Sequence, residues 1–248
     1  MLPSIFKPQY SYKLLRIGSR YDGGYLVESN SLYKSECLIS FGISTNWDFE
    51  KDFLNKNKID LIAFDGSINE TFWENQKLEA LKKFKRLSFA KYFRNYLTKK
   101  RFYQFFKNKN FVPKFISNTL SNSISFEEAL NFTKKENIFL KIDIEGSEYE
   151  IINEIIHHQK KFVGIIIEFH KCGQNLDRIS DFIKKIDLEL SHIHANNNDD
   201  CDEKGVPETI EISFSRSPKR LGNYISLPDK LDRPNKKNRK EIILKFNN

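Results

Sequence analysis

Short apolar runs alternate with longer amphipathic stretches along most of the chain. The runs are rich in β-branched and aromatic residues, which favours buried strands over residues 37–43, 59–65, 138–143, 162–170 and 188–195. The stretches between them have the 3.6-residue spacing of helices and cover residues 46–57, 125–137, 147–159 and 175–187. This alternation predicts an α/β fold with a mainly parallel sheet and helices on both of its faces.

The last predicted strand, residues 208–215, alternates apolar and polar residues. It follows a loop in which we expect no helix. We therefore expect this strand to pair antiparallel with its neighbour. The predicted architecture is a doubly wound sheet, and in such sheets ligands bind beyond the carboxyl ends of the strands. The length of 248 residues suits one α/β domain over residues 1–248.

Two segments lie outside the alternation. Within residues 1–36, the sequence Asp22-Gly23-Gly24 is a tight-turn signal and predicts a hairpin or lid. Residues 70–115 are too long for an ordinary crossover, and we interpret them as an insert of one or two helices.

The insert carries most of the positive charge of the chain. Residues 77–114 contain 13 Lys and Arg against Glu79 alone, whereas the net charge of the whole chain is +8. Aromatic residues are interleaved with these cations. Three interpretations stay open: packing of the insert on the sheet, binding to an anionic membrane surface or lipid-linked acceptor, and, least favoured, contact with nucleic acid.

Composition also limits where the protein acts. No apolar run reaches the length of a membrane-spanning helix, and the N-terminus lacks the sections of a signal peptide. We therefore expect a cytoplasmic protein, with peripheral attachment to the inner membrane as an extension of this prediction. The three cysteines have no zinc-site spacing, and their number does not indicate a disulfide framework.

Polar side chains gather at the carboxyl ends of three consecutive strands. Because residues two apart on a strand share a face, each end presents a pair. The pairs are Asp143 with Glu145, Glu168 with His170, and His194 with Asn196. Carboxylates and imidazoles inside apolar runs are costly unless they meet partners, ligands or water. We therefore predict a functional site on this edge of the sheet.

The sequence KIDIEGSEYEII, residues 141–152, resembles the signature of FkbM-type methyltransferases that use S-adenosyl-L-methionine. The blocks RIGSRYDGGYLV, LISFGISTNWDFEKDF, IAFDGS, IIIEFH, HIHANN and PETIEISFS are similar to other parts of that family and follow in the same order. The resemblance covers about residues 37–67 and 124–234. It implies a Rossmann-like class I methyltransferase fold with seven strands, the last inserted antiparallel, and methyl transfer to an oxygen of a sugar or related small molecule.

Two loops are the expected cofactor site. The candidate residues are Gly42, Ser44, Thr45, Asn46, Asp65 and Gly66. Gly42 permits close approach of a ligand to the backbone, and the three polar residues after it supply hydrogen bonds and a helix cap. Asp65 ends the second strand, where acids of nucleotide-binding sheets accept ribose hydroxyls; the alternative is an ordinary Asp-Gly turn.

Methyl transfer to a hydroxyl requires a base, because alcohols are weak nucleophiles at neutral pH. His170 and Asp143 are the candidates, with Glu168 beside them as a third catalytic residue. Alternatively, Asp143, Glu168, His170 and His194 form a ligand set for Mg²⁺, Mn²⁺ or another divalent metal, which would lower the pKa of the acceptor.

The acceptor is expected to contact the predicted hairpin and the strand ends. The candidate substrate-binding residues are Asp22, Gly23, Tyr25, Glu145, His194 and Asn196. The predicted function is O-methylation of a sugar or glycan precursor in bacterial surface polysaccharide biosynthesis. The alternatives are an RNA methyltransferase and a catalytically degenerate fold that serves as a membrane- or partner-binding module. The absence of an N-P-P-[FYW] segment argues against methylation of a base amine.

Overall fold

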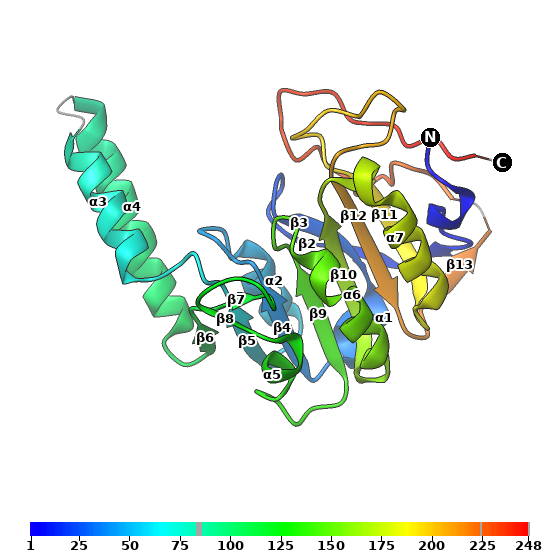
Figure 1. Ribbon diagram of the computed structural model, residues 1–248, viewed down its shortest axis with the longest axis horizontal. Coiled ribbons are helices and arrows are strands. Elements are labelled where there is room, and N and C mark those ends of the chain that lie inside the picture. The colour runs from blue at the N-terminus through cyan, green and yellow to red at the C-terminus, as the bar shows by residue number, and fades with distance from the viewer. Residues whose placement is uncertain (83–85, 224, 248) are drawn as a thin grey trace.

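The computed structural model describes residues 1–82, 86–223 and 225–247, with side chains outside residues 79–92. Its centre is a seven-stranded sheet in the order β11-β12-β10-β9-β4-β5-β6 (Figure 1). The strands are β4 (Cys37–Phe41), β5 (Asp60–Phe64), β6 (Asn110–Val112), β9 (Ile138–Ile142), β10 (Phe162–Phe169), β11 (Glu189–Ala195) and β12 (Ile210–Ser215). Strand β12 is antiparallel to β10 and β11, and the other pairs are parallel. The predicted class I methyltransferase topology is confirmed.

The strands are continuous apolar runs because the two faces of the sheet pack against different cores. One core contains Cys37 and Ile39 of β4, and the other contains Leu38 between them. Helices α5 (Phe126–Leu130), α6 (Glu148–His157) and α7 (Cys172–Lys185) cover the first face. Helices α1 (Ser29–Lys34) and α2 (Asp48–Lys56) lie on the second face (Figure 1).

A β-hairpin, β2 (Leu14–Gly18) with β3 (Gly24–Glu28), also covers the second face. Strand β3 lies against β10, β11 and β12. The polar residues of these strands point toward it: Ser213 donates a hydrogen bond to the Leu26 carbonyl, and Ser215 donates to the Glu28 carboxylate at 3.0 Å. The first face of the same strands is apolar, with Ile210, Ile212 and Phe214 buried. The hairpin therefore encloses the polar side of the sheet.

Residues 70–115 contain more than helices. Helices α3 (Glu70–Lys82) and α4 (Arg86–Phe106) form a two-helix arm that projects from the sheet (Figure 1). The chain then returns as β6, the edge strand beside β5, and continues into β7 (Phe115–Ile116), which pairs with β8 (Ser123–Ile124). Strand β6 has only three residues and no apolar run of its own, so the pattern of the sequence did not reveal it.

Two predicted helix boundaries were wrong. The helix expected over residues 125–137 ends at Leu130, although the capping box of Ser125 and Glu128 forms at its start. The helix expected from residue 175 begins at Cys172, where the strongly bent turn after β10 places Lys171 at φ 52°. The remaining short elements are η1 (Ser4–Phe6), β1 (Ser11–Tyr12), η2 (Gln159–Lys161) and β13 (Arg220–Gly222). None of the described helices combines the length and apolarity that a bilayer crossing requires.

Candidate active site

A pocket of about 340 Å³ opens at the carboxyl ends of β4, β5 and β9. Its lining residues come from four loops: Gly42, Ser44, Phe64, Asp65, Ser67, Lys114, Phe115, Ile116, Leu120, Asp143, Ile144, Glu145 and Ser147. The wall formed by Phe115, Ile116 and Leu120 is apolar, whereas Asp65 and Asp143 supply carboxylates. An apolar wall with a few convergent polar groups is the usual composition of a small-molecule site.

Gly42 is required by the protein backbone. Its φ is 72°, and a Cβ atom at this position would lie 1.6 Å from the carbonyl oxygen of Asp143. The end of β9 thus packs directly on the loop after β4. Lys141, which is buried, donates a hydrogen bond to the Gly42 carbonyl and lies 3.5 Å from Asp143 Oδ2. Gly42 also lines the pocket, and close approach of a ligand to its backbone stays a prediction.

Asp65 holds the loop after β4. Its Oδ2 accepts hydrogen bonds from the amides of Ile43 (2.9 Å) and Ser44 (2.6 Å). Its Oδ1 accepts from the amide (2.8 Å) and the hydroxyl (2.5 Å) of Ser67. Asp65 therefore shapes the pocket as well as lining it, and its contact with a ribose stays a prediction.

Three expected cofactor residues are not among those that line this pocket. Thr45 and Asn46 face a separate groove against α4, and the Asn46 amide donates to the Asp22 carbonyl at 3.1 Å. Gly66 lies under the ring of Phe115, where a Cβ would come within 2.4 Å of a ring carbon. The loop turns at Ser44, whose φ is 51°, and this turn directs the next residues away from the pocket.

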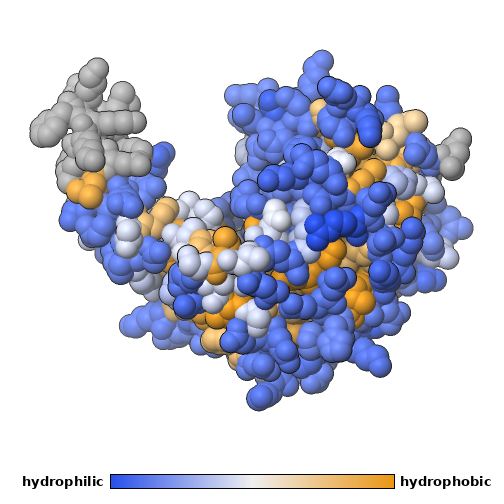
Figure 2. Space-filling model, in the orientation of Figure 1, coloured by the Kyte–Doolittle hydropathy of each residue, from blue (hydrophilic) through white to orange (hydrophobic). Residues whose placement is uncertain are grey.

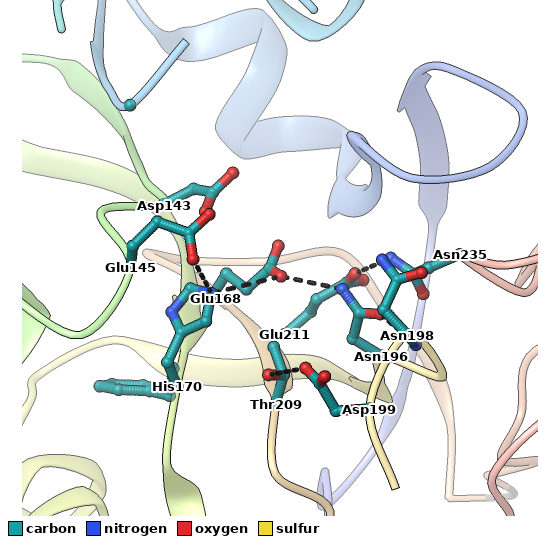
Figure 3. Close-up of polar contacts among 12 residues, drawn as sticks. Asp143, Glu145, Glu168, His170, Asn196, Asn198, Asp199, Thr209, Glu211 and Asn235 are labelled. Carbon is teal, nitrogen blue, oxygen red and sulfur yellow. Dashed lines mark hydrogen bonds and ion pairs between the residues drawn. The ribbon is translucent and has the colours of Figure 1, made fainter. Parts of the chain in front are cut away.

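Beside the pocket, Asp143, Glu168 and His170 offer ligand atoms within 4.8 Å of one another (Figure 3). Asp143 follows β9 and Glu168 ends β10, whose parallel register brings their backbones side by side. The Tyr25 hydroxyl of the hairpin lies 2.8 Å from Glu168 and 3.2 Å from Asp143. Asn196 donates to the second Glu168 oxygen at 2.9 Å. The structure thus brings together five predicted site residues from three strands and the hairpin.

Glu148, a residue that sequence reasoning missed, orients His170. It is fully buried in the first turn of α6, where its carboxylate accepts from the His170 amide (2.6 Å) and from Nδ1 of the ring (3.1 Å). The other ring nitrogen, Nε2, points toward Glu145 (3.6 Å) and Glu168 (3.8 Å). An acidic residue in the first turn of a helix is an ordinary sequence feature, so its pattern carried no signal.

The environment favours a protonated imidazole at His170. Burial opposes the charge, but the hydrogen bond to Glu148 and the charges of Glu148, Glu168 and Asp143 raise the pKa to about 9. Burial raises the pKa of Glu168 well above its usual range, and Asp143 and Glu211 add to the effect. The group can therefore store and move a proton.

His194 is not part of this group, so its expected place in the metal ligand set is wrong. It lies next to Glu211 in the register of β11 and β12, and Glu211 in turn lies next to Glu168. Its Nδ1 is 3.1 Å from Glu211, and its Nε2 contacts Glu241 of the C-terminal segment. Burial opposes the charge, but Glu211 and Glu241 raise the pKa of His194 to about 10. Both ring nitrogens therefore have protein partners, and contact of His194 with a substrate stays a prediction.

The turn of the hairpin meets the C-terminal side of the sheet. Asp22 Oδ1 accepts from the amides of Asn198 (3.3 Å) and Asn235 (3.5 Å), and Asn235 also donates to Glu211 at 2.6 Å (Figure 3). Gly23 contacts the side chain of Asn46. The predicted substrate residues Asp22, Tyr25 and Asn196 therefore surround one polar rim, with Asn198 and Asn235 as additions that the sequence did not indicate.

Comparison with solved structures finds two methyltransferases among the similar chains. The chain is similar to the crystal structure of precorrin-6y C5,15-methyltransferase from Geobacter metallireducens GS-15, with 12% identity over 76% of this chain and 86% of that one and a TM-score of 0.39. It is also similar to the structure titled METTL16 MTase domain, with 8% identity over 75% of this chain and 62% of that one and a TM-score of 0.38. No curated protein matches the chain.

The family comparison is more specific. Residues 84–200 match the family model described as methyltransferase FkbM domain. This range includes β9, β10 and the three clustered residues Asp143, Glu168 and His170. The FkbM-type resemblance of the sequence is thereby confirmed over residues 84–200, which are similar to the methyltransferase FkbM domain.

Proposed function

We propose that the protein is an S-adenosylmethionine-dependent O-methyltransferase that acts on a hydroxyl of a sugar or glycan precursor in bacterial surface polysaccharide biosynthesis. The observation that carries this proposal is the position of Asp143. It lines the 340 Å³ pocket on one side and belongs to the carboxylate and imidazole group on the other. A ligand in the pocket and an acceptor on the polar rim would therefore meet at this residue.

The pocket suits the cofactor that the family implies. Phe115, Ile116 and Leu120 form an apolar wall for an aromatic base, and Asp65, Ser67 and Ser147 offer polar groups. When bound, S-adenosylmethionine supplies an electrophilic methyl group. The rim beside it carries carboxylates and amides, among them Asp22, Asn196 and Asn198, which suit the hydroxyls of a sugar.

His170 is the proposed general base. Glu148 binds Nδ1 and so leaves Nε2 free to take the proton of the acceptor hydroxyl. Glu168 and Asp143 stabilise the imidazolium that forms. Because the pKa of His170 is about 9, only a minor fraction of the enzyme has the free base at neutral pH, and turnover should rise as the pH increases toward 9.

A divalent metal is the second route to acceptor activation. Asp143, Glu168 and His170 offer two carboxylates and one imidazole, a donor set that fits Mg²⁺ or Mn²⁺. Bound there, the cation would lower the pKa of the acceptor hydroxyl. The two routes differ in their response to a chelator: activity lost with chelator and restored by Mg²⁺ or Mn²⁺ supports the metal, and activity indifferent to chelator supports His170 alone.

Calorimetry with S-adenosylmethionine, followed by mass spectrometry of a panel of nucleotide sugars and glycan precursors, tests the function. We expect a dissociation constant in the micromolar range, on the order of −8 kcal/mol, and a mass gain of one methyl group on a sugar. Absence of binding at millimolar cofactor would leave the degenerate binding module. Methylation of RNA, with the sugars untouched, would replace the proposed acceptor.

A further inference from the structure

The arm formed by α3 and α4 is attached to the body at one end only. Phe102 and Phe106 near the end of α4 are buried, and the ring of Trp47 lies 5.5 Å from that of Phe102. Helix α4 has 21 residues and is thus about 30 Å long. Most of its length projects beyond this anchor, as Figure 1 shows. The residues described in the projecting part belong neither to the sheet nor to the lining of the pocket.

Large apolar side chains are exposed along the described part of the arm. Leu78, Phe93, Tyr96 and Tyr103 are each between 44% and 54% exposed. Cations lie among them at Lys77, Arg94, Lys100 and Arg101, all exposed. Figure 2 shows the arm as a hydrophilic surface with apolar spots, set apart from the body by a deep concavity. Mixed cations and aromatics on a projecting helix are typical of a surface that binds at a membrane interface.

The charge of the chain is divided between arm and body. Residues 77–114 carry 13 Lys and Arg against Glu79, a net charge of +12, while the whole chain is +8, so the remainder is acidic. In the described part of the arm the carboxylates are Glu70 and Glu74, and Glu70 is held by Lys99 and Tyr103. A planar anionic surface would therefore attract the arm and repel the body.

The same division disfavours a nucleic acid as the partner. A nucleic acid bound to both the arm and the active site would approach three carboxylates: Glu145, whose side chain is 87% exposed, Asp143 and Glu168. These carboxylates repel phosphates, and Lys141 and His170 beside them are already paired with carboxylates. A membrane needs to touch the arm alone.

We propose that the α3–α4 arm docks the protein on an anionic lipid surface. The cations bind lipid headgroups, and the exposed aromatic and leucine side chains enter the interface between headgroups and acyl chains. This docking does not depend on which acceptor is methylated. It would place the polar rim close to lipid-linked molecules.

Sedimentation of the full chain with vesicles tests the docking. Wild type should sediment with phosphatidylcholine vesicles that contain phosphatidylglycerol at low salt, and should be released at high salt because surface charges are screened within ~10 Å at 0.1 M. Vesicles of phosphatidylcholine alone should bind far less. No sedimentation, or equal sedimentation with neutral vesicles, would overturn the proposal.

Two sets of four substitutions locate the surface. The arm variant replaces Lys77, Arg94, Lys100 and Arg101 with Gln, and the matched control replaces four exposed lysines of the body, Lys134, Lys135, Lys160 and Lys185, with Gln. Both sets remove four charges from exposed positions, and equal thermal midpoints will verify folding. We expect ~10-fold or greater loss of vesicle binding in the arm variant and little change in the control. Equal losses would refute the arm as the surface.

Two further measurements guard the interpretation. Anionic vesicles should protect the wild-type arm from trypsin, a readout that needs no variant. Single-stranded RNA should compete poorly with the vesicles at the same salt. Two results together would show that the arm binds nucleic acid instead. RNA would displace the wild-type protein from vesicles, and the arm variant would bind RNA more weakly than wild type does.

Discussion

The two halves of the carboxyl edge of the sheet are built differently. Strands β4, β5 and β9 end at a pocket with an apolar wall. In the loop after β4, the backbone amides of Ile43 and Ser44 donate hydrogen bonds to Asp65. At β10, β12 and β11 the edge is filled by carboxylates and imidazoles that bind one another under the hairpin. The first half has room for a ligand, and the second has fixed charges.

This difference separates binding from chemistry. Charges that are buried and mutually bonded keep their positions without a ligand, and the low dielectric around them shifts their pKa values. Burial alone would lower the pKa of His170, but Glu148 and the other nearby carboxylates raise it to about 9. In the pocket half, Asp65 serves mainly to hold the backbone. Substitutions in the pocket half should therefore change affinity, and substitutions in the charged half should change turnover.

The sharpest test of this separation is in the charged half. Replacing His170 with Ala should lower kcat by ~10² to 10⁴, the range of a general base, while cofactor affinity stays nearly unchanged. Glu148→Gln keeps the ring in place but removes the charge that raises the pKa of His170, so its pH profile should shift to lower pH. Steady-state kinetics from pH 6 to 10 measure both effects. A His170→Ala enzyme with normal kcat would show that the cluster is structural.

Two glycines probe how the pocket half is packed. Gly42→Ala should lower the free energy of unfolding by roughly 3 kcal/mol or more, because the new Cβ would clash with the Asp143 carbonyl. Gly146→Ala is the matched control: it also has a positive φ, but its Cβ would meet nothing within 4 Å. The free energy of unfolding of this variant should fall only by the roughly 1–2 kcal/mol that backbone strain costs. Equal losses in urea titrations would contradict the close approach of the two strand ends.

A smaller effect is expected at Asp65. Asp65→Asn leaves one oxygen to accept the hydrogen bonds that two oxygens now share, so the loop at Ser44 should loosen and cofactor affinity should fall by ~10-fold. Glu211→Gln, in the charged half, should leave this affinity unchanged. Calorimetry compares the two variants. Weaker binding in Glu211→Gln would mean that the halves are coupled.

The smallest effect concerns stability at alkaline pH. The pKa of His194 is raised to about 10 from 6.5, so the stability it contributes is complete below pH 6.5 and is lost as the pH rises through 10. Glu241→Gln removes one of its two carboxylate partners and should flatten this loss. Thermal midpoints of wild type and variant, measured between pH 6 and 10, report this loss. Each kcal/mol of unfolding free energy corresponds to a shift of ~2–4 °C. Parallel curves for wild type and variant would exclude a role of this pair.

The sequence by itself determined the central sheet strands other than β6, and the polar positions at their ends. Strands buried on both faces need continuous apolar runs, and such runs are readable without any partner. The capping box of Ser125 and Glu128 forms for the same reason, since its contacts are three residues apart. The pairing of Asp143 with Glu168 followed from parallel strands that end at one edge.

Only the tertiary structure decided which groups meet across the chain. Glu148 reaches His170 because α6 packs beneath the end of β10, and Glu211 reaches His194 because β12 inserts between β10 and β11. Thr45 and Asn46 leave the pocket through a turn at Ser44 that no local pattern encoded. Such contacts join residues far apart in sequence, so their partners are set by the packing of whole elements and carry no periodic signal.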